Sequence, residues 1–161
     1  MKALVLYYSR TGNTRKVAEE IASALSADLE ELKDHRKRSG PIGFIKSGFE
    51  ARAHKTVALE PLSHDLSTYD LVVVGTPVWA STMCSPVRTL LLNSALRGHK
   101  VAWFCTASST SRSMHDSCLD AMTSESGLRP VATLGLSTKS LKHDHSEAIS
   151  TFVASIRSAA S

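Results

Sequence analysis

Near its N-terminus the chain reads Ala3-Leu4-Val5-Leu6-Tyr7-Tyr8, continues through Ser9-Arg10-Thr11-Gly12-Asn13-Thr14 and runs on to Arg15-Lys16-Val17-Ala18-Glu19-Glu20-Ile21. The first six residues are an apolar run too short to cross a membrane, and apolar residues at helical spacing follow. This order predicts a buried strand, a tight polar loop and a helix that begins near Asn13. Such a loop gathers backbone N–H groups and the positive end of the helix dipole, so it is a candidate anion site.

The side chains of this loop suit a phosphate group. Ser9, Thr11 and Thr14 offer hydroxyl donors, Asn13 offers an amide donor, and Gly12 can adopt the positive φ of a tight turn. No Gly-Lys-Ser/Thr follows, and a single glycine cannot make the dinucleotide pattern Gly-x-Gly-x-x-Gly. A loop of hydroxyls and amides without a lysine favours a monophosphate over a triphosphate. The alternative is a polar turn that only caps the helix.

The segment Ser9-Arg10-Thr11-Gly12-Asn13-Thr14, placed after a first strand, resembles the phosphate loop of flavodoxins. That resemblance implies that the loop, Arg10 included, binds the 5′-phosphate of flavin mononucleotide (FMN). It also implies a protein that passes electrons through the bound flavin.

The remainder of the chain repeats the alternation of strand and helix. Further strands are predicted at residues 29–32, 70–76, 100–106 and 130–137, and helices at 13–27, 43–53, 86–96, 113–126 and 143–160. This pattern predicts one α/β domain over residues 1–161, a three-layer, doubly wound sandwich around a five-stranded parallel sheet. The resemblance implies the strand order known for flavodoxins, 2-1-3-4-5, with FMN between the ends of the first and third strands.

Two further loops fall at the carboxyl ends of predicted strands. The loop after the third strand offers Trp79, and flavodoxins often stack an aromatic residue of this loop on the flavin ring. Trp79 packed back into the core is the alternative. The loop after the fourth strand is small and polar, so it suits the pyrimidine edge of the ring or is a plain solvated loop. The candidate cofactor residues in these loops are Thr76, Pro77, Val78, Trp79, Ala80 and Ser81, followed by Thr106, Ala107, Ser108 and Ser109.

The sequence departs from the flavodoxin pattern in two respects. Glycine usually lies near the stacking aromatic residue, where a peptide flips to support the one-electron-reduced flavin. Ala80 and Ser81 stand there instead, and a Cβ costs about 1 kcal/mol at positive φ. The chain also has a net charge of +4, whereas flavodoxins are usually acidic. We expect Arg10, Arg88 and Arg112 to flank the site without nearby carboxylates.

Two segments between residues 33 and 49 have more than one interpretation. The basic run Lys33-Asp34-His35-Arg36-Lys37-Arg38 is predicted to be a solvated loop, with an acidic partner or anionic lipid as alternatives. Nucleic acid is disfavoured because no aromatic residues are interleaved with these charges. Residues 39–49 are predicted to lead into a helix that buries Ile42, Ile45 and Phe49. Alternatively, Phe44 and Phe49 form a flap or a subunit contact near the cofactor.

The remaining titratable residues predict no metal site and no catalytic group. Cys84, Cys105 and Cys118 are widely spaced and odd in number, which indicates neither a disulfide framework nor a metal cluster. His143 and His145, at the start of the last helix, are predicted to cap it or to be solvated. His115 is predicted at the surface, with the flavin edge as its alternative.

Two functions fit these observations. The first is an electron carrier that serves redox partner proteins, as a monomer or weak homodimer. The second is a small FMN-dependent oxidoreductase that acts on a quinone, a porphyrin-type compound or NAD(P)H. The lack of a catalytic acid or base favours the carrier, whereas the missing glycine and the basic charge favour the enzyme. Since neither a signal peptide nor a membrane span is evident, a cytoplasmic location is expected.

Overall fold

The computed structural model of the chain describes residues 1–35 and 40–160. Short 3₁₀ turns at Leu66–Thr68, Ser94–Leu96 and Ser140–Lys142 join the main elements. The main elements are β1 (Ala3–Tyr7), α1 (Asn13–Leu25), β2 (Asp28–Glu31), α2 (Gly40–Arg52), β3 (Leu71–Trp79), β4 (Thr82–Met83), α3 (Ser85–Leu92), β5 (Lys100–Ala107), α4 (Arg112–Ser126), β6 (Thr133–Ser137) and α5 (Ser146–Ala160).

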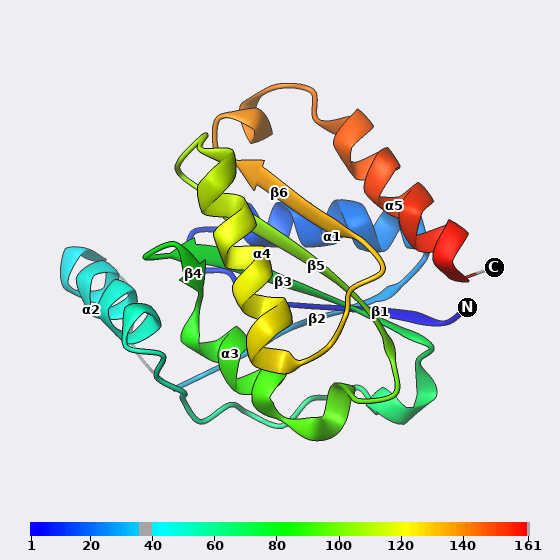
Figure 1. Ribbon diagram of the computed structural model, residues 1–161, viewed down its shortest axis with the longest axis horizontal. Helices are drawn as coiled ribbons and strands as arrows, with labels where there is room; N and C mark the ends of the chain where they lie inside the picture. The colour runs from blue at the N-terminus through cyan, green and yellow to red at the C-terminus, as the bar shows by residue number, and fades with distance from the viewer. Residues whose placement is uncertain (36–39, 161) are drawn as a thin grey trace.

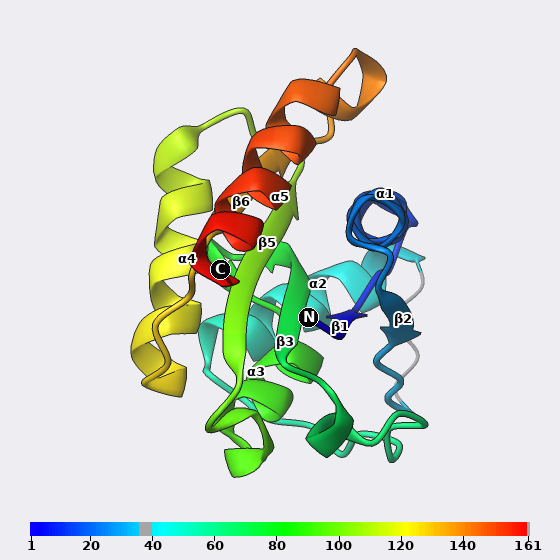
Figure 2. The same ribbon diagram turned by 90° about the vertical axis from the view of Figure 1, so that its right-hand side faces the viewer.

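The sheet has the order β2-β1-β3-β5-β6, and all four pairings along it are parallel. With the short β4 set aside, this is the predicted order 2-1-3-4-5, so the doubly wound α/β architecture is confirmed. Helices α3 and α4 cover one face of the sheet, and α1 and α5 cover the other (Figure 1). The start of β1 and the end of α5 lie at the same end of the molecule (Figure 2).

Alternate residues of each central strand point into one of two apolar cores, as the two-residue period of a strand requires. Val72 and Val74 of β3 point towards α3 and α4, whereas Leu71 and Val73 point towards α1 and α5. All four are completely buried. A continuous apolar run such as residues 71–74 is typical of a parallel strand that is covered on both faces.

Gly75 of β3 leaves room for an aromatic ring from the neighbouring strand. It is the register partner of Phe104 on β5. The Phe104 ring occupies the space that a Cβ at residue 75 would need. This glycine is thus required by packing on the strand that leads into the site.

The segment after the predicted third strand is a β-hairpin and not a loop. β3 continues to Trp79 instead of ending at Thr76, and the chain returns antiparallel through β4. Ala80 and Ser81, at the turn, have φ of 50° and 64°. Two positive φ values match the hairpin turns whose twist suits a strand pair, although glycine or asparagine usually fills them. The left-handed conformation expected to be costly here is therefore already present.

The prediction that α2 buries Ile42, Ile45 and Phe49 is wrong. Their exposed fractions are 81%, 70% and 62%, whereas Ser47 and Ala51 are 1% and 0% exposed. The helix packs its small residues inward, because these allow close contact with β3, β4 and α3. Arg36, Lys37, Arg38 and Ser39 lie outside the described residues, and so does the Phe44 side chain. The hypotheses about them therefore stay untested.

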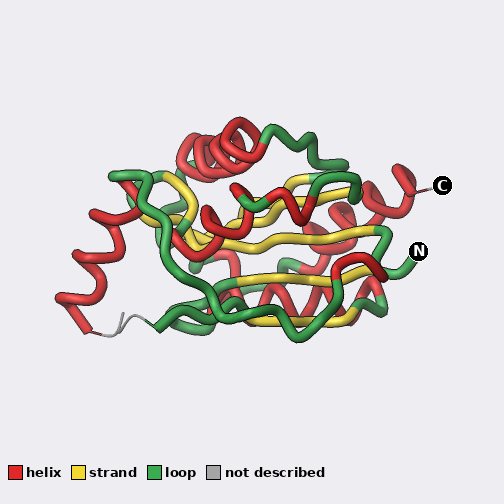
Figure 3. Tube along the Cα trace, turned by 90° about the horizontal axis from the view of Figure 1, so that it is seen from below, coloured by secondary structure: helices red, strands yellow, loops and turns green. Residues whose placement is uncertain are grey.

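Helix α2 stands at the end of the molecule opposite the two chain termini (Figure 3). The carboxyl ends of the parallel strands lie at that same end, since β1 starts beside the N-terminus. None of the described helices is long and apolar enough to cross a membrane.

Candidate functional site

A cavity of about 370 Å³ lies at the carboxyl ends of β1, β3, β5 and β6. Each of the three predicted site segments contributes to it. Thr138, just after β6, also lines the cavity. Thr138 was not predicted as a site residue, because no site loop was predicted after the last strand. The lining residues are Arg10, Thr11, Asn13, Thr14, Pro77, Val78, Trp79, Thr106, Ala107, Ser108 and Thr138.

The first loop is shaped by Gly12 and Ser9, which do not line the cavity. Gly12 has φ of 96° and is the N-cap of α1. The Ser9 hydroxyl oxygen accepts hydrogen bonds from the backbone N–H groups of Gly12 (3.1 Å) and Arg15 (3.3 Å). The N-cap residue Gly12 makes no side-chain hydrogen bond to the helix, and the first turn of α1 contains no acidic residue. Its positive dipole end therefore faces the cavity without a carboxylate of its own.

Thr14, at the end of the first loop, contacts the end of β5, where the third site loop begins. Its side-chain oxygen lies 2.8 Å from that of Thr106, and both residues are almost fully buried. Thr106 is the register partner of Pro77, so the ends of β3 and β5 stand level with each other. Hydroxyl groups from two distant segments therefore meet at the floor of the cavity.

Trp79 is buried, with 7% of its surface exposed, and still lines the cavity. Its ring meets the ring of Tyr8 edge to face, with 5.7 Å between centroids and 87° between planes. The ring belongs to the core cluster on the α3–α4 face, which was the alternative placement for it. Pro77 and Val78 also line the cavity, whereas Ala80 and Ser81 form the exposed tip of the turn and do not.

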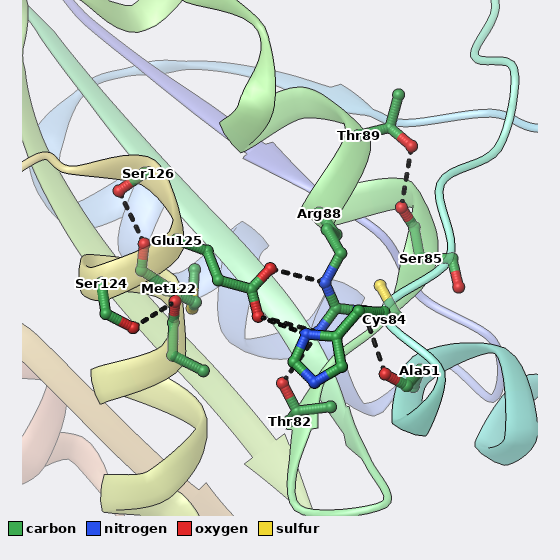
Figure 4. A network of polar contacts seen from close by, with 12 residues as sticks. Ala51, Thr82, Cys84, Ser85, Arg88, Thr89, Met122, Ser124, Glu125 and Ser126 are labelled. Atoms are coloured by element: carbon green, nitrogen blue, oxygen red, sulfur yellow. Dashed lines mark hydrogen bonds and ion pairs between the residues drawn. The ribbon is translucent and has the colours of Figure 1, made fainter.

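A buried arginine holds the hairpin that carries Trp79 (Figure 4). Arg88 of α3 is 1% exposed, and its guanidinium donates to Thr82 Oγ1 (3.1 Å) on β4 and to the Ala51 carbonyl (3.1 Å) on α2. It also forms a two-pronged ion pair with Glu125 of α4, at 2.7 and 3.2 Å. His54 Nδ1 lies 3.0 Å from the same carboxylate. The guanidinium of Arg88 is therefore buried and its charge is neutralised by Glu125. The prediction that Arg88 flanks the site as a cation without nearby carboxylates is wrong.

His115 supports the third loop from below. It is 8% exposed, so its predicted surface position is wrong. Its Nε2 lies 3.2 Å from the Ser109 carbonyl, while a Cβ on Gly135 of β6 would come within 2.7 Å of the His115 Cβ. The glycine on β6 was the sequence signal for this burial. Ser109 itself does not line the cavity, whereas its neighbour Ser108 does.

The cysteines and the C-terminal histidines lie away from the cavity. Cys84, Cys105 and Cys118 are free and buried. The neighbouring Cys105 thiol and burial raise the pKa of Cys118 well above its usual range, so this thiol stays protonated. The Asp144 carboxylate accepts from the Ser146 N–H at the start of α5, and His145 pairs with Glu20. The described residues contain no group of three metal-binding side chains.

The residues present suit a phosphorylated ligand with a flat apolar part. Arg10 is the charged side chain among the lining residues, and it lies beside the N-terminus of α1. Hydroxyl and amide donors line the same side, whereas Pro77, Val78 and Trp79 supply an apolar wall. The volume falls within the roughly 300–1,000 Å³ that is usual for small-molecule sites.

Residues 2–144 match the family described as Flavodoxin. The chain belongs to the flavodoxin family. A flavoprotein from Lactobacillus acidophilus NCFM, solved in complex with FMN, is 25% identical to this flavodoxin with a TM-score of 0.71. The match covers 88% of this chain and 96% of that one. FMN, the cofactor expected from the sequence, is thereby confirmed for the family.

Two other similarities show the shared fold or cover only part of the two chains. Oxidised Flavodoxin 2 from Bacillus cereus has a TM-score of 0.61 at 18% identity, covers 98% of this flavodoxin and 99% of that chain, and shows the shared fold. A protein of Syntrophus aciditrophicus (strain SB) named NAD(P)H dehydrogenase (quinone) is 30% identical over 95 residues, or 56% of this flavodoxin. The match spans about half of that relative, 47% of its length.

Proposed function

We propose that the cavity at the strand ends binds FMN and that the protein is an electron carrier between redox partner proteins. The phosphate would lie on the first loop, at the N-terminus of α1, and the flavin ring between Trp79 and the third loop. The proposed cofactor residues are Ser9, Arg10, Thr11, Gly12, Asn13 and Thr14, then Thr76, Pro77, Val78, Trp79, Ala80 and Ser81, and finally Thr106, Ala107, Ser108 and Ser109.

These residues divide into two groups. Thr11, Asn13 and Thr14 line the cavity and offer donors to a phosphate, whereas Ser9 and Gly12 fix the backbone that surrounds it. Ala80 and Ser81, at the exposed tip of the hairpin, and Ser109, in the loop after β5, do not line the cavity. FMN supplies the electron chemistry, and the protein residues bind and orient it.

The composition of the cavity lining is the observation that favours a carrier. The lining contains no aspartate, glutamate, histidine, cysteine or lysine among the described residues, so it holds no usual general acid or base. A carrier needs none, because it only exchanges electrons with its partners. A substrate that gains protons as well as electrons would have to find its proton donor elsewhere.

A titration of the apo protein with FMN tests the cofactor assignment. The fluorescence of bound flavin should be strongly quenched, because Trp79 lines the cavity. Replacing Thr11 and Thr14 together by alanine should weaken binding about tenfold or more, since two donors of about 1 kcal/mol each are removed. Unchanged affinity in that double variant would contradict the phosphate position. Trp79→Ala should recover part of the fluorescence.

The similarity to the quinone dehydrogenase supports a second candidate, an FMN-dependent oxidoreductase. Mixing the FMN-loaded protein with NADH or NADPH in the absence of oxygen distinguishes the two proposed functions. Rapid loss of the flavin absorbance without an added reductase, followed by reoxidation with a soluble quinone, would establish the enzyme. A carrier should stay oxidised until a reductase protein is added.

A further inference from the structure

Helix α2 carries an apolar stripe on its outer face. Ile42, Ile45 and Phe49 follow each other at intervals of three and four residues, so they lie along one side of the helix. All three are more than half exposed. Ser47 and Ala51, on the opposite side, are buried against the body of the protein. Contiguous exposed apolar residues of this size mark an interaction surface.

Cationic side chains border this α2 stripe on both sides. Lys46 follows Ile42 by four residues, Arg52 follows Phe49 by three, and both are exposed. Lys55, just beyond the helix, places its Nζ 5.2 Å from the centre of the Phe49 ring. Glu50, the acidic residue of the helix, is 3% exposed. The exposed charges of α2 among the described residues are therefore all positive.

We propose that the α2 stripe docks on an anionic lipid bilayer. Isoleucine and phenylalanine side chains suit the boundary between headgroups and acyl chains. Lysine and arginine at the edges of an apolar stripe can keep their charges at the lipid phosphates while their stems cover apolar surface. The stripe residues Ile42, Ile45 and Phe49 offer no side-chain hydrogen bonds, whereas protein interfaces carry many.

Charge argues against a second copy of this chain as the occupant. Two facing stripes would bring Lys46, Arg52 and Lys55 of both copies together, and like charges in an interface repel. An anionic bilayer provides the opposite charge over the whole length of the helix, which is about 20 Å for 13 residues.

The position of α2 connects this surface to the cofactor cavity. The helix packs on β3 and β4, the hairpin that carries Trp79. It projects from the end of the molecule where the strands terminate, away from both chain termini (Figure 3). Docking through the stripe would therefore turn that end towards the membrane. The proposal does not depend on the function proposed above, because lipid binding requires neither flavin nor electrons.

Flotation with lipid vesicles tests the proposal, on the full chain with and without FMN. We expect binding to vesicles of phosphatidylcholine with one third phosphatidylglycerol and none to phosphatidylcholine alone. Binding should fall about tenfold when salt rises from about 0.05 to 0.3 M, because screening weakens the attraction. No binding to the anionic vesicles, in either form of the protein, would overturn the proposal.

Paired variants locate the contact. Ile45→Ser with Phe49→Ser should weaken vesicle binding about tenfold or more, whereas Leu92→Ser, at a residue of α3 that is 53% exposed, should leave it unchanged. Lys46→Gln with Arg52→Gln should weaken it several-fold, with Arg129→Gln as the matched control. Equal binding by the serine variant and the wild type would exclude the stripe as the contact.

A fluorescent reporter identifies the environment of the stripe directly. Phe49→Trp should show a blue shift with anionic vesicles and quenching by lipids with brominated acyl chains, and Leu92→Trp should show neither. If gel filtration instead finds a wild-type dimer that Ile45→Ser with Phe49→Ser dissociates, and vesicles bind neither protein, the stripe is a self-association surface and the proposal fails.

Discussion

The side-chain oxygens of Thr14, in the first turn of α1, and Thr106, near the end of β5, lie 2.8 Å apart, although 92 positions separate the two residues in the sequence. This hydrogen bond fixes the spacing between the proposed phosphate loop and the third loop. One of the two hydroxyls donates and the other accepts, so one proton is left free to point elsewhere. We expect that the pair acts as a unit in cofactor binding.

Thr14→Val keeps the side-chain volume and removes its hydroxyl. FMN affinity should fall about tenfold, because a donor worth about 1 kcal/mol is lost and the Thr106 partner is released. The double variant with Thr106→Val should lose less than the sum of the two single effects. Fluorescence titration measures all three, with Thr133→Val on β6 as a control. Strictly additive losses would contradict the coupling.

Arg88→Met should lower the free energy of unfolding by about 2–3 kcal/mol. The change leaves the half-buried Glu125 carboxylate without its arginine partner and Thr82 without its donor. Adding Glu125→Gln should restore part of the loss, because the remaining buried charge is removed. Urea unfolding provides the measurement, and the exposed Arg129→Met should change little. An unchanged free energy of unfolding in Arg88→Met would show that the contacts of Arg88 contribute nothing to stability.

Ala80→Gly should stabilise the protein by about 0.5 kcal/mol. The φ of 50° at Ala80 costs a residue with a Cβ about 1–2 kcal/mol, and the greater freedom of glycine in the unfolded chain offsets part of the gain. Ala95→Gly is the matched control, since Ala95 has no positive φ and should be destabilised. Thermal unfolding of the two apo variants distinguishes them. Destabilisation by Ala80→Gly would mean that the turn does not hold this conformation.

The stability contributed by His145 should depend on pH. The carbonyl of His143, which accepts from Nδ1, raises the pKa of His145 above its usual 6.5, and Glu20 adds to this against the effect of burial. A raised folded-state pKa means that the contribution is complete below the unfolded value and is lost as pH rises through the folded one. His145→Gln should therefore be destabilising near about pH 5.5 and nearly neutral near about pH 8.5. An equal effect at both pH values in urea unfolding would refute this.

The sequence allowed the sheet order and the three site segments to be predicted, because both follow from local patterns. Buried β-branched runs define the strands, and their carboxyl ends must lie at one edge of the sheet. The hairpin at Ala80 and Ser81 could not be found this way, since both residues have positive φ, whereas glycine, asparagine or aspartate usually fills a two-residue hairpin turn.

Tertiary context also explains the errors at α2 and His115. The periodicity of Ile42, Ile45 and Phe49 identifies a helix face but not the neighbour it meets, and here Ser47 and Ala51 face the protein. His115 is buried because Gly135, which is distant in sequence, leaves room for its ring. The sequences of α2 and of the segment around His115 do not by themselves show which distant residues they pack against.

The cavity draws its lining from segments far apart in the chain, from Arg10 to Thr138. During synthesis on the ribosome, the first loop emerges long before β5 and β6 exist to complete the walls. A nascent chain therefore has no finished cofactor pocket until the residues up to Thr138 have left the exit tunnel. Flavin supply should consequently affect how long the completed protein survives and not how its folding begins.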